Sequence, residues 1–549
     1  MKKNTIICLI LILILGAFFR FYQLGQIPNS ISADEAALGY NAYSILETGR
    51  DEYGQKFPLI FASFDDHKNP VFIYLLVPFI KIFGFSIFAL KLPNAILGSL
   101  VILLFYFLTK KLVNNNNTAL ISAFLAAICP WLIHFSRVGI ELNTAFFFSL
   151  LGVWLFLSAK EKDWLYIPSA LIFSLAFWCY HPAKLWVTLF GFFLTVFTII
   201  QTKKITKGLV IGLIIFAILA IPNANLYLKG SISSRSYGIS VFKNEQDKAV
   251  NAKFLAEDIE KQNLPGRFIH NRRLVPVNQF INGYLDITSP KIIFDQDIPN
   301  HIQKIRLMYL WQIPLIILGL AVLFQKRKSV FIIILVWLFF GYIPGAITIL
   351  PGFDRRIFVN SFPLIFLSAI GLMEILKLVK KQKRPISLCC YFVMLICLIF
   401  SFASFSHFYY SHGKKAVIDL WGNSMEQLVK ETTGLEDKFE NVIVSTSLDQ
   451  PYMYFLFYKK YPPKKYLSEG GTISGSIFAD KNKFGKYAFA KIDQQNLNQN
   501  TLYITKANEN VPGLTTIKKI LQTDGRPLAN ICIFDPAKSV RKKLGIPTN

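Results

Sequence analysis

Long apolar stretches constrain this chain more than any other feature of its sequence. Several of them run for about 18 residues or more with few charges, the length that a helix needs to cross a hydrocarbon layer of ~30 Å. The composition agrees: 53% of the residues are hydrophobic and 17% are charged, whereas about a quarter of a soluble domain is charged. The sequence therefore predicts an α-helical polytopic membrane protein.

Basic residues between these stretches predict their orientation. Short cytoplasmic loops of membrane proteins accumulate lysine and arginine. If the N-terminus is cytoplasmic, the N-terminus itself and every turn that would then face the cytoplasm are basic. The first stretch lacks a small-residue cleavage site, so we interpret it as an uncleaved helix. The eleven predicted spans lie near 5–22, 86–109, 118–135, 142–159, 164–180, 184–201, 207–228, 307–324, 329–350, 356–377 and 386–408.

One further apolar segment, residues 70–84, is interpreted as a juxtamembrane helix. It is only about 15 residues long and contains Lys81 and Pro78, which suits a helix in the interface better than a span. Counting it as a span would also move every later basic turn to the outer face. The formal net charge of +26 follows from these turns, and we expect anionic lipid headgroups rather than nucleic acid as its partner.

Three polar regions share the outer face in this topology: loop 23–85, loop 229–306 and the C-terminal region. Residues 1–408 are predicted to form the transmembrane domain. Residues 409–549 alternate strand-like and helix-like runs, which predicts a small extracytoplasmic α/β domain. The seven cysteines give neither a disulfide framework nor a metal knuckle.

Ionisable residues at membrane depth are costly and usually functional, and the candidates here all map to the outer face. A carboxylate can accept the proton of an attacking hydroxyl or amine, and arginine and lysine can hold a departing phosphate. Such a set suits the transfer of a sugar from an anionic lipid-linked donor. The candidates are Asp34, Glu35, Asp65, Asp66, His67, Lys68, Arg137, Glu141, His181, Lys184, Arg355 and Arg356.

Structural explanations compete with this interpretation. Ser32 and Glu35 spell a capping box, which can coexist with catalysis. The cluster from Asp65 to Lys68 can be a solvated turn, Arg137 and Glu141 an ordinary i,i+4 pair, and Lys184 a side chain that reaches the headgroups. Asp295-Gln-Asp297 spells the D-x-D pattern of soluble glycosyltransferases, but the pattern is too short to be specific.

In their order and spacing, several short pieces resemble the membrane glycosyltransferases of the GT-C class, specifically the superfamily of protein O-mannosyltransferases and lipid A aminoarabinose transferases. The resemblance covers residues 5–408. Its pieces are Asp34-Glu35-Ala36, His67 to Pro70 before a helix ending at Phe83-Gly84, Phe88 to Pro93, Cys129 to Arg137 with Glu141, Ser289 to Phe294, and Thr348 to Arg356.

The resemblance implies a polyprenyl-phosphate sugar donor, an inverting transfer to an envelope acceptor (lipid, glycan or protein), and a multi-pass protein of the plasma (inner) membrane. It maps the catalytic base onto Asp34 or Glu35, and the donor phosphate onto Arg137, Lys184 and Arg355 or Arg356. It implies no metal cofactor, with a divalent cation near Asp34 and Asp65 left open. Two other functions stay open from the sequence: a transporter or flippase of lipid-linked sugars, and a scaffold for envelope assembly.

Overall fold

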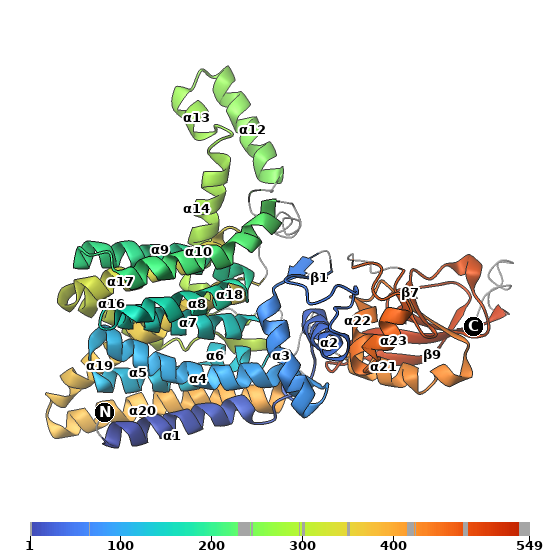
Figure 1. The fold of residues 1–549 in the computed structure, drawn as a ribbon, viewed down its shortest axis with the longest axis horizontal. Helices are drawn as coiled ribbons and strands as arrows, with labels where there is room; N and C mark the ends of the chain where they lie inside the picture. Colours follow the sequence, from blue (N-terminus) through green and yellow to red (C-terminus); the bar gives the residue numbers. More distant parts are fainter. Residues whose placement is uncertain are drawn as a thin grey trace.

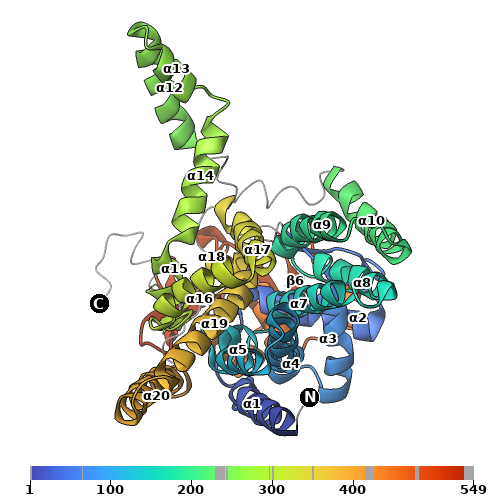
Figure 2. The ribbon, with the colours of Figure 1, turned by 90° about the vertical axis from the view of Figure 1, so that its left-hand side faces the viewer.

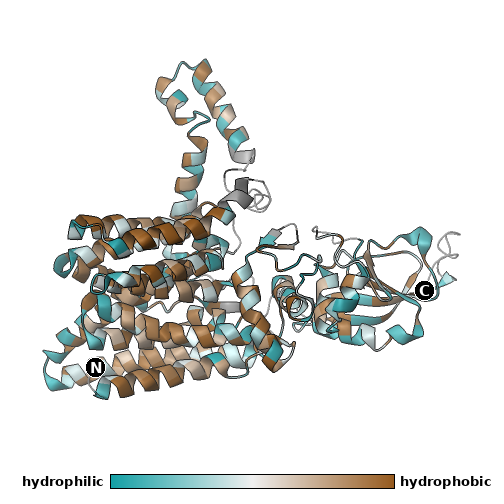
Figure 3. Cartoon of the chain, viewed as in Figure 1, coloured by the Kyte–Doolittle hydropathy of each residue, from teal (hydrophilic) through white to brown (hydrophobic). Residues whose placement is uncertain are grey.

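The computed structural model describes residues 3–64, 66–228, 242, 245–295, 297–298, 302–348, 352–413, 422, 424–475 and 481–536. Helices gather into a bundle at one side, and a sheet with short helices lies beyond one end of it (Figure 1). Apolar residues dominate the bundle helices, whereas polar and apolar residues mix in the sheet region (Figure 3).

Apolar helices build the bundle. Six of them, within the described residues, are long and apolar enough to cross a membrane, and the protein is therefore a multi-pass membrane protein. These six are α1 (Lys3–Phe21), α4 (Ile87–Val113), α9 (His181–Thr202), α17 (Lys328–Ala346), α19 (Ser361–Lys380) with the preceding η3 (Phe358–Asn360), and α20 (Arg384–His407) with the following η4 (Phe408–His412).

Shorter apolar helices lie at the other predicted spans. They are α5 (Asn116–Ile128), α6 (Pro130–Phe135), α7 (Leu142–Ser158), η1 (Asp163–Leu165), α8 (Tyr166–Phe177), α10 (Lys207–Leu228) and α16 (Gln312–Lys326). The span predicted at 118–135 is divided between α5 and α6 because Pro130 has no N–H with which to continue the helix. The total of eleven spans stays a prediction.

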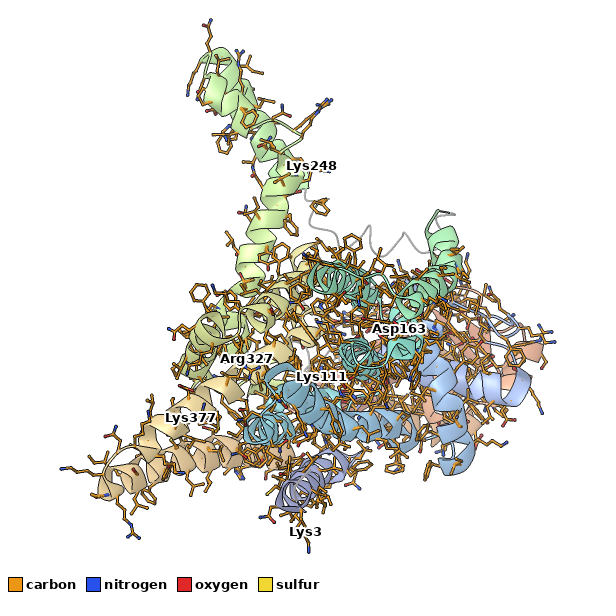
Figure 4. The ribbon with its side chains drawn as sticks, turned by 60° about the vertical axis from the view of Figure 1, so that its left-hand side comes forward. Lys3, Lys111, Asp163, Lys248, Arg327 and Lys377 are labelled. Atoms are coloured by element: carbon orange, nitrogen blue, oxygen red, sulfur yellow. The ribbon has the colours of Figure 1, made fainter. Side chains whose placement is uncertain are left out.

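The basic turns lie at the end of the bundle away from the sheet. Figure 4 shows Lys3, Lys111, Arg327 and Lys377 at this end, which faces the viewer. Ion pairs connect some of these turns: Lys111 Nζ lies 2.6 Å from Glu161 Oε1, and Lys326 Nζ lies 2.7 Å from Glu374 Oε1. The helix bundle therefore has one basic end and one end that carries the sheet, which we call the sheet-bearing face.

The first loop folds against the sheet-bearing face. It contains α2 (Ala33–Thr48), a hairpin of β1 (Phe61–Ser63) and β2 (Asp66–Lys68), and α3 (Pro70–Phe83). Ser32 caps α2 by accepting a hydrogen bond from Glu35 N, and the Glu35 carboxylate accepts one from Ser32 N, which confirms the predicted capping box. Helix α3 has 14 residues and packs against α2 and α4.

The C-terminal region combines a six-stranded sheet with three helices, α21 (Met425–Thr433), α22 (Pro451–Tyr458) and α23 (Pro463–Ser468). The strand order is β6-β7-β5-β8-β10-β9, with β5 parallel to both neighbours and the other pairs antiparallel. The strands are β5 (Asn441–Ser445), β6 (Lys483–Phe484), β7 (Tyr487–Ala490), β8 (Thr501–Lys506), β9 (Leu514–Leu521) and β10 (Pro527–Phe534).

Within the described residues, four helices follow α10 along the chain: α12 (Glu245–Glu260), α13 (Leu264–Ile269), α14 (Val275–Thr288) and α15 (Pro290–Phe294). A ribbon of β3 (Asp297–Ile298) and β4 (Ile302–Arg306) comes after them. Helix α14 packs on α17. From there α12 and α13 project away from the bundle in both views (Figures 1 and 2).

A buried carboxylate joins the first loop to the C-terminal region. Glu52 is fully buried and accepts hydrogen bonds from Asn41 Nδ2 at 3.0 Å and from Thr472 Oγ1 at 2.7 Å. Because the buried carboxylate loses its hydration, burial raises the pKa of Glu52 to about 7. The two regions are thus connected by a group that titrates near neutral pH.

This group predicts a pH dependence of stability. The folded protein binds the Glu52 proton more tightly than the unfolded chain, in which the pKa of this carboxyl group is 4.5. Stability from this group is therefore fully present below pH 4.5 and is lost as pH rises to about 7, by about 3 kcal/mol in total. We expect the melting temperature to fall over that window in the parent protein, and to fall less in Glu52→Gln. Equal slopes of melting temperature against pH in the parent protein and in Glu52→Gln would contradict this prediction. Glu47→Gln, on the exposed end of α2, is the control variant.

Candidate active site

Asp34 lies in the first turn of α2 and forms an ion pair with the hairpin. Its Oδ1 is 2.5 Å from Lys68 Nζ, where the Lys68 side chain is 6% exposed and that of Asp34 is 31% exposed. The strand pairing of β1 with β2 brings Lys68 to this position, 34 residues along the chain from Asp34. The carboxylate is therefore oriented by a buried cation and is still open to solvent.

Glu35, the neighbouring acid, has a different environment. It is fully buried, and while Oε2 accepts from Ser32, Oε1 accepts from Gly139 N at 2.6 Å. Burial raises the pKa of Glu35, against the opposing charge of Lys91. A Cβ at Gly139 would lie 2.6 Å from Leu90 and 3.1 Å from Glu35, so only glycine fits this approach. Glu35 holds α2 against the turn before α7, whereas Asp34 faces outward.

The hairpin also contacts the start of α9. His181 Nε2 lies 2.8 Å from the carbonyl oxygen of His67, and Val71 N donates to the Trp178 carbonyl at 3.5 Å. His181 is the first residue of α9, so the strand that carries Lys68 is attached to the turn between α8 and α9. Asp34 and this turn therefore belong to one contact network.

A cavity opens between α7, the start of α9 and α18 (Phe353–Arg356). Its empty space, open mouth included, is about 330 Å³, and most of its wall is apolar. Two basic residues, Arg355 and Arg356, are among the residues of that wall. Its lining residues are Leu142, Ala145, Phe146, Ser149, Tyr180, Pro182, Ala183, Trp186, Arg355, Arg356, Phe358 and Val359.

Two routes of contact connect this cavity to Asp34. One runs from Lys68 through the His67 carbonyl to His181, which lies between the cavity residues Tyr180 and Pro182. The other runs from Glu35, beside Asp34 on α2, to Gly139, three residues before Leu142. Asp34 on α2 is therefore connected, through these contacts, to segments that line the cavity containing Arg355 and Arg356.

Acidic groups accompany the arginines. Asp354 is fully buried, and burial raises its pKa to about 6 against the opposing charge of Arg355. Gly352 caps α18 with φ +95°, and a Cβ there would lie 3.1 Å from Arg355 Nη2. The left-handed backbone and this close approach both call for glycine. Glu141 precedes α7. Its negative charge and the positive charge of Arg355 have opposite effects on the hydroxyl of Tyr180.

Arg137 lies elsewhere. Its fully buried guanidinium donates to four backbone carbonyls at the end of α1, those of Phe19, Arg20, Gln23 and Ile27, at 2.8–3.3 Å. It also lies over the rings of Tyr409 and Tyr410, at 5.7 and 5.2 Å from their centroids. The structure places Arg137 as a clamp between α1 and the segment after α6, not in the wall of the cavity.

Because the Arg137 guanidinium makes these four hydrogen bonds, we expect a large loss of stability in Arg137→Lys. The ammonium keeps the charge but cannot reach four carbonyls, and each charged hydrogen bond contributes about 1.5–3 kcal/mol. We expect a free energy of unfolding lower by at least ~3 kcal/mol, read as a lower melting temperature, with the donor KM unchanged in the folded protein. Arg50→Gln, at an exposed site, is the control. A raised donor KM at unchanged stability would assign Arg137 to the phosphate instead.

Lys184 is 7% exposed and lies on α9 near the cavity but not in its wall. Its ammonium is 5.9 Å from the ring centroid of Phe177 and 6.0 Å from that of Trp178. Asp65 lies outside the described residues, as does the side chain of Asp66, and the D-x-D pattern is described only in part. Among the described residues no cluster of three His, Cys, Asp or Glu could hold a metal ion.

Sequence reasoning missed three further charged residues. Lys91, buried in α4, donates to the Pro28 carbonyl at 2.8 Å and so holds the chain that leads to α2. Arg20, buried in α1, donates to the carbonyls of Gly16, Ala126 and Ala127. Asp449 is exposed and precedes α22, which packs on α2. A charge inside an apolar span was the available signal for Arg20 and Lys91.

Comparison with known proteins gives one family. Residues 67–221 match the family model described as dolichyl-phosphate-mannose-protein mannosyltransferase. The matched segment includes His67, Lys68, Glu141, His181 and Lys184, and ends before α18. A search of curated proteins finds no match.

Solved structures with a similar fold include archaeal oligosaccharyltransferase structures and the protein named ArnT. AglB from Archaeoglobus fulgidus, in complex with an inhibitory peptide and a dolichol-phosphate, has 13% identity and a TM-score of 0.52, covering 83% of this chain and 64% of that chain. The same archaeal enzyme with Zn and sulfate has 14% identity and a TM-score of 0.51, covering 82% and 61%. ArnT from Cupriavidus metallidurans in the apo state has 10% identity and a TM-score of 0.52, covering 96% and 98%.

The chain thus spans less than two thirds of the archaeal oligosaccharyltransferase and nearly all of ArnT. At these identities the structural similarity establishes the fold. Together with the family match over residues 67–221 it confirms the predicted resemblance: the chain has the fold of the GT-C membrane glycosyltransferases.

Proposed function

We propose that the protein transfers a sugar from a polyprenyl-phosphate donor to an envelope acceptor at the sheet-bearing face of the bundle. The observation that supports this most strongly is the cavity between α7, α9 and α18, because its wall combines apolar side chains with Arg355 and Arg356. An amphiphile with one phosphate needs both: an apolar surface for its chain and cations for its headgroup.

In this proposal Asp34 is the catalytic base. Its carboxylate accepts the proton of the acceptor hydroxyl or amine while that oxygen or nitrogen forms a bond to the anomeric carbon. The bond from the anomeric carbon to the phosphate oxygen breaks with inversion, and its electron pair leaves on the polyprenyl phosphate. Lys68 orients the carboxylate, and Glu35 fixes the helix turn from which Asp34 extends.

Arg355 and Arg356 stabilise the departing phosphate, whose negative charge grows as the sugar leaves. Lys184, near the same cavity, is proposed to contribute to the field around it. The fold neighbour AglB was solved with a dolichol-phosphate and an inhibitory peptide, which supports a lipid phosphate on the donor side. We propose that the acceptor approaches between α2 and the C-terminal region, where α22 packs on α2.

The orientation follows from charge. With the basic end in the cytoplasm, as the positive-inside rule favours, α2, α18 and the C-terminal sheet face outward. We propose the plasma (inner) membrane, with eleven spans and an extracytoplasmic active site. Residues 1–408 are the transferase domain in this proposal, and residues 409–549 are a second domain at the same face.

A transfer assay in proteoliposomes tests the function. The purified protein is supplied with synthetic polyprenyl-phosphate sugars and with a membrane extract as acceptor, and products are identified by mass spectrometry. We expect a new glycosidic product and free polyprenyl phosphate in equal amounts. Movement of the donor across the bilayer without such a product would assign a flippase instead. Because a related enzyme was solved with Zn, each reaction is run with and without a chelator.

A further inference from the structure

The segment formed by α12, α13 and α14, which we call the lateral hairpin, projects sideways from the bundle. In Figure 1, where the bundle helices lie across the picture, it extends away from them near the ends that approach the sheet-bearing face. In Figure 2, viewed along the bundle, it extends outward past α17. The lateral hairpin therefore runs beside the bundle in the direction in which a surrounding bilayer would extend.

Its internal contacts fold it into a defined unit. His270 Nδ1 lies 2.5 Å from Asp258 Oδ2, and Asn263 Nδ2 donates to Asp258 Oδ1 at 3.0 Å. Asn251 Nδ2 donates to the His270 carbonyl at 2.7 Å, which connects α12 with the end of α13. At its base, Tyr284 OH donates to the Phe339 carbonyl on α17 at 3.3 Å. Its outward side chains are thus presented by a folded element.

Large apolar side chains cover the outside of this element. On α14, Val277, Ile281 and Leu285 recur every four residues and are 49%, 46% and 63% exposed. At the tip, Leu264 and Phe268 are 71% and 73% exposed. These values match those of the apolar bundle helix α20, where Leu388 is 60% and Phe400 is 72% exposed. In water such a surface would be costly.

Basic residues surround the apolar tip. Between Lys261 and Leu285 the chain carries four basic residues, Lys261, Arg267, Arg272 and Arg273, and the acidic residues Glu257, Asp258, Glu260 and Asp286 flank this stretch. Lys261 lies 3.8 Å from Glu257, so Arg272 and Arg273 are the basic pair that matters here. Arg272 and Arg273 are exposed in the turn between α13 and α14. Exposed aromatic and aliphatic side chains flanked by arginine and lysine are typical of elements that lie in the membrane interface, where the cations meet lipid phosphates.

We propose that the lateral hairpin lies in the interface of the membrane leaflet at the sheet-bearing face. Its occupant is the lipid surface: Leu264, Phe268 and the α14 stripe enter the acyl boundary, and Arg272 and Arg273 contact anionic headgroups. Two observations favour lipid over a protein partner. The apolar surface continues that of the bundle from which α14 departs, and the flanking charge is complementary to phosphate. The proposal does not depend on the transferase activity.

Spin-label accessibility in nanodiscs tests it. Labels are attached to Phe268→Cys and Ile281→Cys in full-length protein whose cysteines in α1 and α20 are replaced by alanine. Asn282→Cys is the matched control, one residue from Ile281 and so about 100° around α14. In discs containing phosphatidylglycerol, we expect oxygen to relax the labels at 268 and 281 several-fold more than a water-soluble nickel chelate does, and the reverse at 282.

Equal accessibility of all three sites to the nickel chelate would overturn the proposal, since the hairpin would then lie in water. Labels at 268 and 281 that neither reagent reaches would also overturn it, in favour of a covering protein. Arg272→Glu with Arg273→Glu should reduce the oxygen preference at 268 in phosphatidylglycerol discs and leave it unchanged in discs of neutral lipid. An unchanged preference in both lipids would refute the headgroup contact.

Discussion

Replacement of Asp34 by asparagine is expected to lower sugar transfer by about 10²–10⁴-fold, the contribution of a positioned general base. The amide has the size and the hydrogen-bonding reach of the carboxylate but cannot take the acceptor's proton. Because Asp34 is not among the residues that line the cavity and is proposed to act on the acceptor, the loss should appear in kcat with little change in the donor KM. The measurement is product formation in proteoliposomes.

Two further variants keep this result interpretable. Asp34→Asn removes a carboxylate partner of Lys68, which is 6% exposed, and the loss of a partner destabilises a buried charge. The double variant Asp34→Asn with Lys68→Met removes that charge, so it should recover stability and stay inactive. Glu47→Gln, at the exposed end of the same helix, should keep parent activity. Parent activity in Asp34→Asn would assign the base to another residue.

Loss of both cavity arginines is the second large effect. In Arg355→Gln with Arg356→Gln, two charged contacts to the donor phosphate are removed, each contributing about 1.5–3 kcal/mol. The donor KM should therefore rise by about 10²–10⁴-fold in total, measured with a synthetic polyprenyl-phosphate sugar. The single variants divide this effect between the two residues. Arg327→Gln, at the basic end of the bundle, is the charge-matched control and should leave KM unchanged.

A variant that fills the cavity should raise the donor KM, as the variant that removes the arginine charges does. Ala145 lines the same cavity, and Ala145→Phe adds apolar volume there while both arginines stay in place. We expect the donor KM to rise in this variant also, because the lipid chain loses its surface. Unchanged KM in the double arginine variant and in Ala145→Phe would place the donor elsewhere in the molecule.

The sequence predicted the helical membrane fold, the position of most helices, and a region of strands and helices after the last span. These depend on local patterns: apolar length, basic turns and strand-like runs. The break between α5 and α6 shows the limit of such patterns, because apolar residues continue through it and only Pro130 interrupts the backbone ladder. Strand β9 was missed, since its exposed lysines give it little apolar alternation.

Pairings over long sequence separations could not be predicted. Residue type identified Asp34 and Lys68 as candidates, but their contact depends on how the β1-β2 hairpin packs on α2. For Arg137 the sequence suggested a phosphate ligand, whereas its four partners are carbonyls left open by the end of α1, which no side-chain pattern records. The capping box was predictable because both of its residues lie within one turn.

A structure of the protein in nanodiscs with bound polyprenyl phosphate tests the central claim most directly. We predict phosphate density against Arg355 and Arg356, with the lipid chain leaving along α7 and α9, and space for a single sugar between that phosphate and the Asp34 carboxylate. Phosphate density at the basic end of the bundle, or beside the arginines but separated from Asp34 by packed side chains, would contradict the claim.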